Sequence, residues 1–188
     1  MTPATVSYVA LLRGVNVGGN TRVAMADLRD VLSRLGFENA RSLLQSGNVV
    51  FGAGERSTDG LERLLEREVA ARFGMSIDVL VRTGDQIAAV VAGNPFKTEA
   101  QRDPGRLQVF FLKGAPGTAA VKGLQDAIVG REVARVRGNV AYIVYPDGMG
   151  RSRLASTLVE RRLGVRATAR NWNTVQKLHT MLTSPEGV

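Results

Sequence analysis

Two stretches of this chain carry hydrophobic patterns that predict the same order of strands and helices. Over residues 1–83, short apolar runs typical of buried strands alternate with apolar residues at helical spacing, in the order β-α-β-β-α-β. Residues 107–182 predict this order again, and an extra helix follows each copy. The order is that of the split βαβ, ferredoxin-like arrangement. The sequence therefore predicts an α+β protein made of two ferredoxin-like halves.

The first half shows the pattern most clearly. The run YVALL at 8–12 predicts a buried strand, and the apolar spacing over 25–36 predicts a helix. Ser46 and Gly47 stand between two strand-like runs and predict a two-residue hairpin turn. A second helix is predicted over 57–73, where leucine, valine and phenylalanine fall on one stripe.

The predicted domain boundaries follow from this order. A short helix and then a polar stretch with two prolines, which we expect to be a loop, separate the halves. The prediction has four parts: 1–83 as the first half, 84–106 as the connecting helix and polar loop, 107–182 as the second half with a C-terminal helix, and 183–188 as a tail.

Short sequence matches between the halves favour an internal duplication. Gly47-Asn48-Val49 matches Gly138-Asn139-Val140, and FGAGERS at 51–57 parallels YPDGMGRS at 145–152 with one residue inserted. The alternative is chance similarity between short strands. The shared order of elements favours duplication.

The charge of the chain favours anionic partners. The chain has 25 basic and 17 acidic residues and a net charge of +8. Residues 131–177 hold ten basic against three acidic residues, a local excess of +7. Such an excess is typical of surfaces that bind nucleic acid, nucleotides, phosphorylated metabolites or membranes. The alternative is a solvated basic face without a partner.

Several classes of site and location are excluded or not expected. The chain has no cysteine and one histidine, His179, so we expect no disulfide, no metal site and no cofactor. The first residues lack the features of a signal peptide, and no apolar run is long enough to span a membrane. We therefore expect a cytoplasmic protein, and the oligomeric state stays open.

The first candidate site lies where the first strand ends. In the split βαβ order, the third strand lies beside the first and runs opposite to it, so the loop after Leu12 meets the hairpin turn. Glycine-rich turns before a helix are suited to binding anions, and an arginine can pair with a phosphate or carboxylate. The pattern G-x-x-x-G-G matches no nucleotide fingerprint, and the alternative is simple turn chemistry. The candidate residues are Arg13, Gly14, Asn16, Gly18, Gly19, Gln45, Ser46 and Asn48.

The second half offers its own candidate edge, formed by the segments that follow its third and fourth strands. Trp172 is the only tryptophan, and its ring either stacks on a ligand or fills the core. Asn173 or Thr174 is either a ligand-binding residue or the N-cap of the last helix. His179 falls on the apolar stripe of that helix, which favours packing over a catalytic role. The candidate residues are Arg151, Ser152, Arg170, Asn171, Trp172, Asn173 and Thr174.

The sequence shows no arrangement typical of a nucleophilic enzyme. Ser46 has no G-x-S-x-G motif around it and no evident histidine partner. Whether the chain is an enzyme stays open. The leading hypothesis is a protein that binds a phosphorylated or other anionic small ligand in a cleft formed by these loops, with Arg13 and Arg170 on the anion. The alternatives are nucleic-acid binding by the basic 131–177 surface and a non-catalytic protein-interaction module.

Several segments resemble a known family. In order, these are ALLRGVNVGG, MADLRDVLSRLGF, LQSGNVVF, NPF, GMGRSRL and ARNWNTVQKL. They resemble the bacterial domain-of-unknown-function family 1697, over about residues 6–182. The resemblance implies a cytosolic bacterial protein with a duplicated α+β fold, and it implies no particular activity. It also implies that both candidate edges are signature segments of the family.

Overall fold

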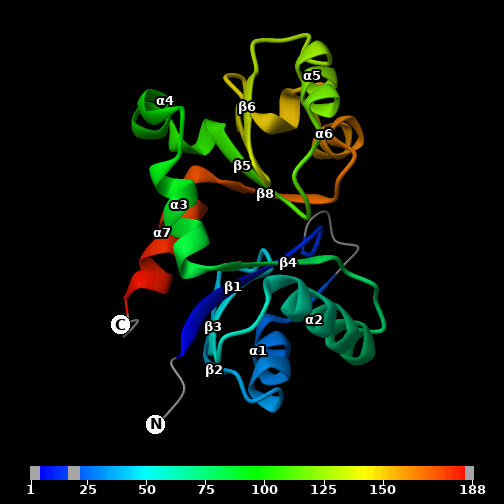
Figure 1. Ribbon diagram of the computed structural model, residues 1–188, viewed down its shortest axis with the longest axis vertical. Helices are drawn as coiled ribbons and strands as arrows, with labels where there is room; N and C mark the ends of the chain where they lie inside the picture. The colour runs from blue at the N-terminus through cyan, green and yellow to red at the C-terminus, as the bar shows by residue number, and fades with distance from the viewer. Residues whose placement is uncertain (1–4, 17–21, 185–188) are drawn as a thin grey trace. The chain divides into compact units, whose positions relative to one another are not determined.

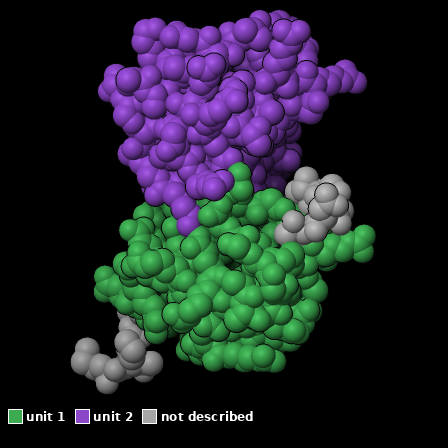
Figure 2. Space-filling view, turned by 90° about the vertical axis from the view of Figure 1, so that its right-hand side faces the viewer, with its two compact units in different colours: residues 1–89, 178–188 green, residues 90–177 purple. Residues whose placement is uncertain are grey.

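The computed structural model describes residues 5–16 and 22–184. The chain divides into two compact units, unit 1 with residues 1–89 and 178–188 and unit 2 with residues 90–177 (Figure 2). Each unit contains one four-stranded antiparallel sheet (Figure 1). Within the described part of the chain, every helix is too short or too polar to cross a lipid bilayer.

Unit 1 alternates strands and helices in the predicted order. Its elements are β1 (Val6–Leu12), α1 (Met25–Arg34), β2 (Glu38–Leu43), β3 (Asn48–Ala53), α2 (Thr58–Phe73) and β4 (Val79–Thr83). Two further helices, α3 (Gly84–Ala92) and α7 (Trp172–Thr183), contain the boundaries between the units.

Unit 2 repeats the order after two short helical segments. Its elements are α4 (Lys97–Arg102), the 3-10 helix η1 (Pro104–Arg106), β5 (Leu107–Leu112), α5 (Thr118–Asp126), β6 (Val133–Arg137), β7 (Val140–Val144), the 3-10 helix η2 (Met149–Arg151), α6 (Ser156–Leu163) and β8 (Ala167–Asn171).

Both sheets place their strands in the same spatial order. The sheet of unit 1 runs β2-β3-β1-β4, and that of unit 2 runs β6-β7-β5-β8. Every neighbouring pair is antiparallel. The first strand of each half therefore has a partner on both sides. This confirms the predicted α+β class with two ferredoxin-like halves.

The strand register shows which residues occupy equivalent positions in the two sheets. The Leu12 N–H donates to the Gly47 carbonyl at 2.8 Å, and the Leu112 N–H donates to the Asn139 carbonyl at 3.0 Å. Gly47 is therefore equivalent to Asn139, whereas the sequence match aligns it with Gly138. Gly47 and Gly138 both have positive φ, 73° and 56°, so the match reflects a shared turn requirement. Internal duplication stays a prediction.

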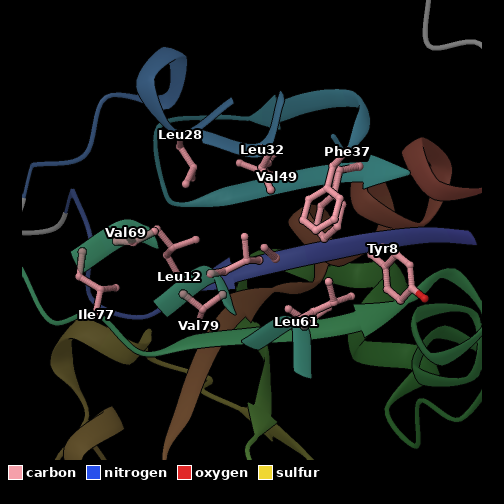
Figure 3. Packing of buried hydrophobic residues seen from close by; sticks show 14 of the residues in the cluster. Tyr8, Leu12, Leu28, Leu32, Phe37, Val49, Leu61, Val69, Ile77 and Val79 are labelled. Atoms are coloured by element: carbon pink, nitrogen blue, oxygen red, sulfur yellow. The ribbon is translucent and has the colours of Figure 1, made fainter. Parts of the chain in front are cut away.

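The core of unit 1 lies between one face of its sheet and the helices α1 and α2 (Figure 3). Alternate residues of β1, namely Tyr8, Ala10 and Leu12, point into it, and α1 contributes Leu28 and Leu32. These are the residues that helical and strand spacing predict to be buried. Burial of one leucine side chain contributes about 1.5–3 kcal/mol to the free energy of unfolding.

The core of unit 2 has the same plan. Phe110 and Leu112 of β5 pack with Leu124 of α5 and with Val159 and Leu163 of α6. All five residues are at most 2% exposed. The helices that follow the first and third strands thus cover one face of the sheet in each half.

Glutamates from the helices satisfy backbone groups on the outer strand of each sheet. On β4, the Val79 N–H donates to Glu66 and the Val81 N–H donates to Glu62, each at 2.9 Å. On β8, the Ala167 N–H donates to Glu160 at 2.7 Å. A carboxylate acceptor at a strand edge satisfies a donor and discourages pairing with another chain.

The polar stretch 93–106, predicted to be a loop, instead contains α4 and η1. The Asn94 side chain accepts a hydrogen bond from the Phe96 N–H at 2.9 Å, and Phe96 is only 9% exposed. This local turn and the buried ring fix the start of α4. Five of the six residues of the helix are good helix formers, so the two prolines were a misleading signal.

We expect replacement of Glu160 to destabilise unit 2. Glu160→Ala removes the acceptor of the Ala167 N–H and should lower the free energy of unfolding by about 1–3 kcal/mol. Glu160→Gln keeps a side-chain oxygen and should cost less than half as much. Urea unfolding of both variants measures the difference. Equal losses in the two variants would contradict a role for the hydrogen bond.

Candidate functional site

The loop after β1 contacts the turn between β2 and β3, as the split βαβ order predicts. The Leu12 N–H donates to the Gly47 carbonyl at 2.8 Å, and the Asn16 side-chain amide donates to the Gln45 carbonyl. The predicted site residues Gly18 and Gly19 lie outside the described residues. We call the segments 13–16 and 44–47 together the loop edge of unit 1.

Gly47 allows the close approach of these two segments. Its φ is +73°, in the left-handed region that favours glycine. A Cβ atom at this position would lie 2.9 Å from the Leu12 Cβ and would also clash with the Val15 Cγ2. The loop edge therefore depends on the absence of a side chain at this position.

The turn itself is longer than the sequence predicts. β2 ends at Leu43 and β3 begins at Asn48, so four residues connect the strands instead of two. Leu44 has φ +58° and is 57% exposed. A left-handed conformation costs a leucine about 1–2 kcal/mol, so this turn combines backbone strain with an exposed apolar side chain.

Two of the predicted amide side chains hold the loop edge together. Asn16 Nδ2 donates to the Val23 carbonyl, and Asn16 Oδ1 accepts from the Val23 N–H, both at 2.9 Å. The buried Asn48 donates to Ser46 Oγ at 2.9 Å and to the Leu43 carbonyl at 3.2 Å. These bonds fix the backbone of both segments.

Arg13 is bound to its own unit. Its guanidinium lies 3.7 Å from the Asp78 carboxylate, and both side chains are about one-third exposed, at 29% and 33%. The Arg13 N–H also donates to the Asp78 carbonyl at 2.9 Å. Gly14, next to it, has φ +68° and open space where a Cβ would stand.

A cavity of about 450 Å³ lies beside the loop edge. It is lined by Asn16, Arg22, Val23, Ala24 and Gln45. The helix α1 begins at this point, and its N-cap residue Ala24 makes no side-chain hydrogen bond to the first turn. The first N–H groups of a helix carry partial positive charge, so the cavity lies next to a region of positive potential and is lined by an arginine and two amide side chains.

Sequence reasoning missed Arg22. It lies directly after the glycine-rich loop and is exposed. The sequence could have indicated it, because Arg22 is a basic residue just before a helix start. Negative side chains stabilise a helix at this end, so an arginine there suggests another role.

Most polar residues of the second candidate edge are buried or form hydrogen bonds within the protein. Arg170 on β8 is 9% exposed, and its Nη1 donates to Thr168 Oγ1 at 2.7 Å and to the Ala169 carbonyl at 2.8 Å. Burial lowers the pKa of the Arg170 guanidinium to about 10, because removal from water disfavours the charged form.

The start of α7 also uses its polar residues locally. Asn171 Oδ1 accepts a hydrogen bond from the Thr174 N–H at 3.0 Å, so Asn171 caps the helix, whereas the sequence favoured Asn173 or Thr174. Trp172 is 4% exposed and Thr174 is 7% exposed. This burial favours the interpretation of Trp172 as a packed side chain. Asn173 is exposed.

In the segment before α6, the predicted site residue Ser152 also forms hydrogen bonds within the protein. Ser152 Oγ donates to the Glu132 carboxylate and accepts from the Leu154 N–H at 2.9 Å. Its neighbour Arg151 is exposed. Among residues 5–16 and 22–184, no group of three or more histidines, cysteines or acidic residues could hold a metal ion.

Comparison with known proteins identifies the family. The model of the family "Protein of unknown function (DUF1697)" matches residues 6–142. The chain belongs to the DUF1697 family. The match includes the loop edge of unit 1 and every strand and helix from β1 to β4. No curated protein matches this DUF1697 chain.

The solved structure of one similar protein supports the fold. The chain is similar to the conserved bacterial protein SP0830 from Streptococcus pneumoniae, with 25% identity and a TM-score of 0.74. The alignment covers 96% of this chain and 100% of that one. A second structure, "Crystal structure of Putative Chlorite dismutase TA0507", aligns over 94% and 99% of the chains with 14% identity and a TM-score of only 0.28.

We expect Gly47→Ala to disrupt the loop edge of this DUF1697 protein. Left-handed strain of about 1–2 kcal/mol adds to a clash of about 1–3 kcal/mol, so the free energy of unfolding should fall by roughly 2–5 kcal/mol. Gly14→Ala is the matched control, since it meets the same strain without a clash. Urea unfolding distinguishes them, and equal destabilisation would contradict the role of close packing at Gly47.

Proposed function

We propose that this protein binds a phosphorylated or other anionic small ligand in the cavity beside the loop edge of unit 1. The observation that carries the proposal is the combination of Arg22 with the start of α1, which has no side-chain cap, in one cavity of about 450 Å³. Helix N-termini next to a basic side chain are suited to anions because both contribute positive potential.

The charges around the cavity support this assignment. Among the described residues that line the cavity, none is acidic. The acidic residue in the first turn of α1, Asp27, forms an ion pair with Arg72 of α2 at 2.9 Å. The potential of Arg22 and of the helix start is therefore not cancelled by a carboxylate in the cavity wall.

The rigidity of the loop edge supports the proposal as well. Of the three non-glycine residues with positive φ in the described residues, Asn16 and Leu44 lie at this edge. Strained backbone tends to occur at binding sites, where the surrounding structure holds it in place. In the proposed site, Arg22 and Gln45 contact the anion, and Asn16 fixes the segments that carry them.

The predicted role of Arg13 enters the proposal in a modified form. Its ion pair with Asp78 is partly exposed, and exposed ion pairs contribute only about 0–1 kcal/mol. An anion can therefore compete for the guanidinium at low cost. We propose Arg13 as a second, weaker contact at the rim of the site.

An internal duplication is a further part of the proposal. The two halves share strand order and register. The Glu66–Val79 bond of the first half also has an equivalent, Glu160–Ala167, in the second. We infer that the two halves derive from one ancestral unit, in which only the first retained or acquired the proposed anion site.

We expect inorganic phosphate and nucleoside monophosphates to stabilise the protein through Arg22. A ligand at 100 times its Kd adds about 2.7 kcal/mol to the free energy of unfolding, which raises the Tm of a chain of this size by roughly 5–10 °C. Arg22→Ala should lose most of that shift. The exposed Arg63 of α2 provides the matched control Arg63→Ala, which should keep it. Thermal unfolding and calorimetric titration give both quantities.

Two results would contradict the proposal. One is the absence of any stabilisation by small anions in the unmodified protein. The other is an equal loss of stabilisation in Arg22→Ala and Arg63→Ala, which would point to general charge effects. A partial loss in Arg13→Ala would support its place at the rim, and no loss would remove it from the site.

A second candidate function is nucleic-acid binding by unit 2. Four exposed arginines flank or lie on α6, namely Arg151, Arg153, Arg161 and Arg162. Within the described residues, none of the four forms an ion pair with an acidic side chain. Solvated arginines of this kind release counterions when they bind phosphates.

This second function predicts a steep dependence on salt. If the four arginines contact phosphates of a duplex, log K should fall with log salt with a slope of about −3 to −4. Arg161→Gln with Arg162→Gln should reduce the slope by roughly 2, while Arg63→Gln on α2 should leave it unchanged. Fluorescence anisotropy with a labelled duplex measures this, and a salt-independent affinity would contradict the hypothesis.

A further inference from the structure

A second hollow, in unit 2, has a chemistry different from the cavity in unit 1. Its volume is about 440 Å³. Its lining comes from α4 and η1 on one side and from β6 and the end of β7 on the other: Thr98, Glu99, Arg102, Asp103, Arg106, Val133, Val144 and Pro146. We call it the α4 groove.

One side of this groove is formed by the segment 93–106, which the sequence predicted to be a loop. Asn94 turns the chain by accepting the Phe96 N–H at 2.9 Å, and the Phe96 ring is buried. The helix α4 then presents Thr98 and Arg102, one turn apart, to the same hollow.

Arg106 has a defined position in the groove. Its Nε lies 3.4 Å from an Asp103 carboxylate oxygen. On its other side it lies against the backbone of Gly148, where any Cβ would clash with Nη1. Gly148 has φ +89°, a conformation that favours glycine. The guanidinium is therefore held between a carboxylate and a backbone surface, with donors left for a ligand.

The other two charges of the groove have no such partner. Glu99 and Arg102 have opposite charge and lie three residues apart on α4. Within the described part of the chain, neither takes part in an ion pair shorter than 4.0 Å. The groove thus offers one carboxylate and one guanidinium that are both available to a ligand.

The floor of the groove is apolar. Val133 and Val144 are direct partners in the β6–β7 ladder, and Pro146 follows two residues later. Val133 is 39% exposed, although valine on a strand is usually covered. An exposed apolar surface with charged groups around it is typical of a ligand site.

We propose that the α4 groove binds a zwitterionic ligand with an apolar side chain, that is, an apolar α-amino acid or a dipeptide. Arg102 and Arg106 bind its carboxylate, Glu99 binds its ammonium group, and Val133, Val144 and Pro146 contact its side chain. The volume lies within the range of small-molecule sites, about 300–1,000 Å³. The lining carries two arginines and two carboxylates, so neither a simple anion nor a simple cation meets a net attractive charge.

The test uses three probes of similar shape: L-leucyl-L-leucine, N-(4-methylpentanoyl)-L-leucine, which lacks the ammonium group, and L-leucine 3-methylbutylamide, which lacks the carboxylate. Binding is measured by NMR from the methyl signals of Thr98, Val133 and Val144. We expect the dipeptide to bind at least tenfold more tightly than either analogue. Arg102→Gln and Glu99→Gln should each weaken its binding at least fivefold.

Two control variants test whether the dipeptide binds in this groove and not elsewhere on the chain. Arg135→Gln on the exposed face of β6 should leave dipeptide binding unchanged, and so should Arg22→Ala in the proposed anion site. The proposal is overturned if the dipeptide does not bind at 10 mM, if both analogues bind as well as it does, or if Arg102→Gln and Glu99→Gln have no effect. The proposal for the α4 groove does not depend on phosphate binding at Arg22.

Discussion

The pairing of β1 with both β3 and β4 determines which loops can meet in unit 1. At the end of β1, the Leu12 N–H reaches the Gly47 carbonyl, and the Arg13 N–H reaches the Asp78 carbonyl on the opposite side. These two bonds fix the direction in which the chain leaves the sheet. The contact of Asn16 with Gln45 and Val23, the start of α1 and the cavity at Arg22 all depend on that direction.

The polar residues of the two candidate edges mostly hold the fold together. Asn16, Asn48 and Asn171 each use a side-chain amide to fix a turn or a helix start. Arg170 is buried in its own strand. Glycine, asparagine and arginine near a helix start can bind a ligand, but the same residues can also form hydrogen bonds that stabilise a turn of the backbone. Their presence in the sequence therefore locates the edge, and the exposed neighbours Arg22 and Gln45 are the residues that we propose for binding.

The sequence predicted the elements and their order because burial leaves a strong periodic signal. The stripe Met25, Leu28, Val31 and Leu32 of α1 is buried as expected. Contacts between the loop after β1 and the β2–β3 turn were also predictable, since they follow from strand order. The turn length, the position of α4 and the cavity at Arg22 were not. They depend on side-chain hydrogen bonds such as Asn94 with Phe96, which leave no periodic pattern.

The two halves share a topology but not a candidate site, and the turn between their second and third strands shows why. In unit 1 four residues connect β2 and β3, and they supply Gln45 and the strained Leu44. In unit 2 only Gly138 and Asn139 connect β6 and β7. A two-residue turn has no position equivalent to Gln45, so the second half cannot build the same cavity wall. Its candidate groove lies instead where α4 precedes the sheet, in a segment that the core order β-α-β-β-α-β does not include. Each candidate site thus depends on a departure from the shared plan, which supplies Gln45 to the cavity in unit 1 and Glu99, Arg102 and Arg106 to the α4 groove in unit 2.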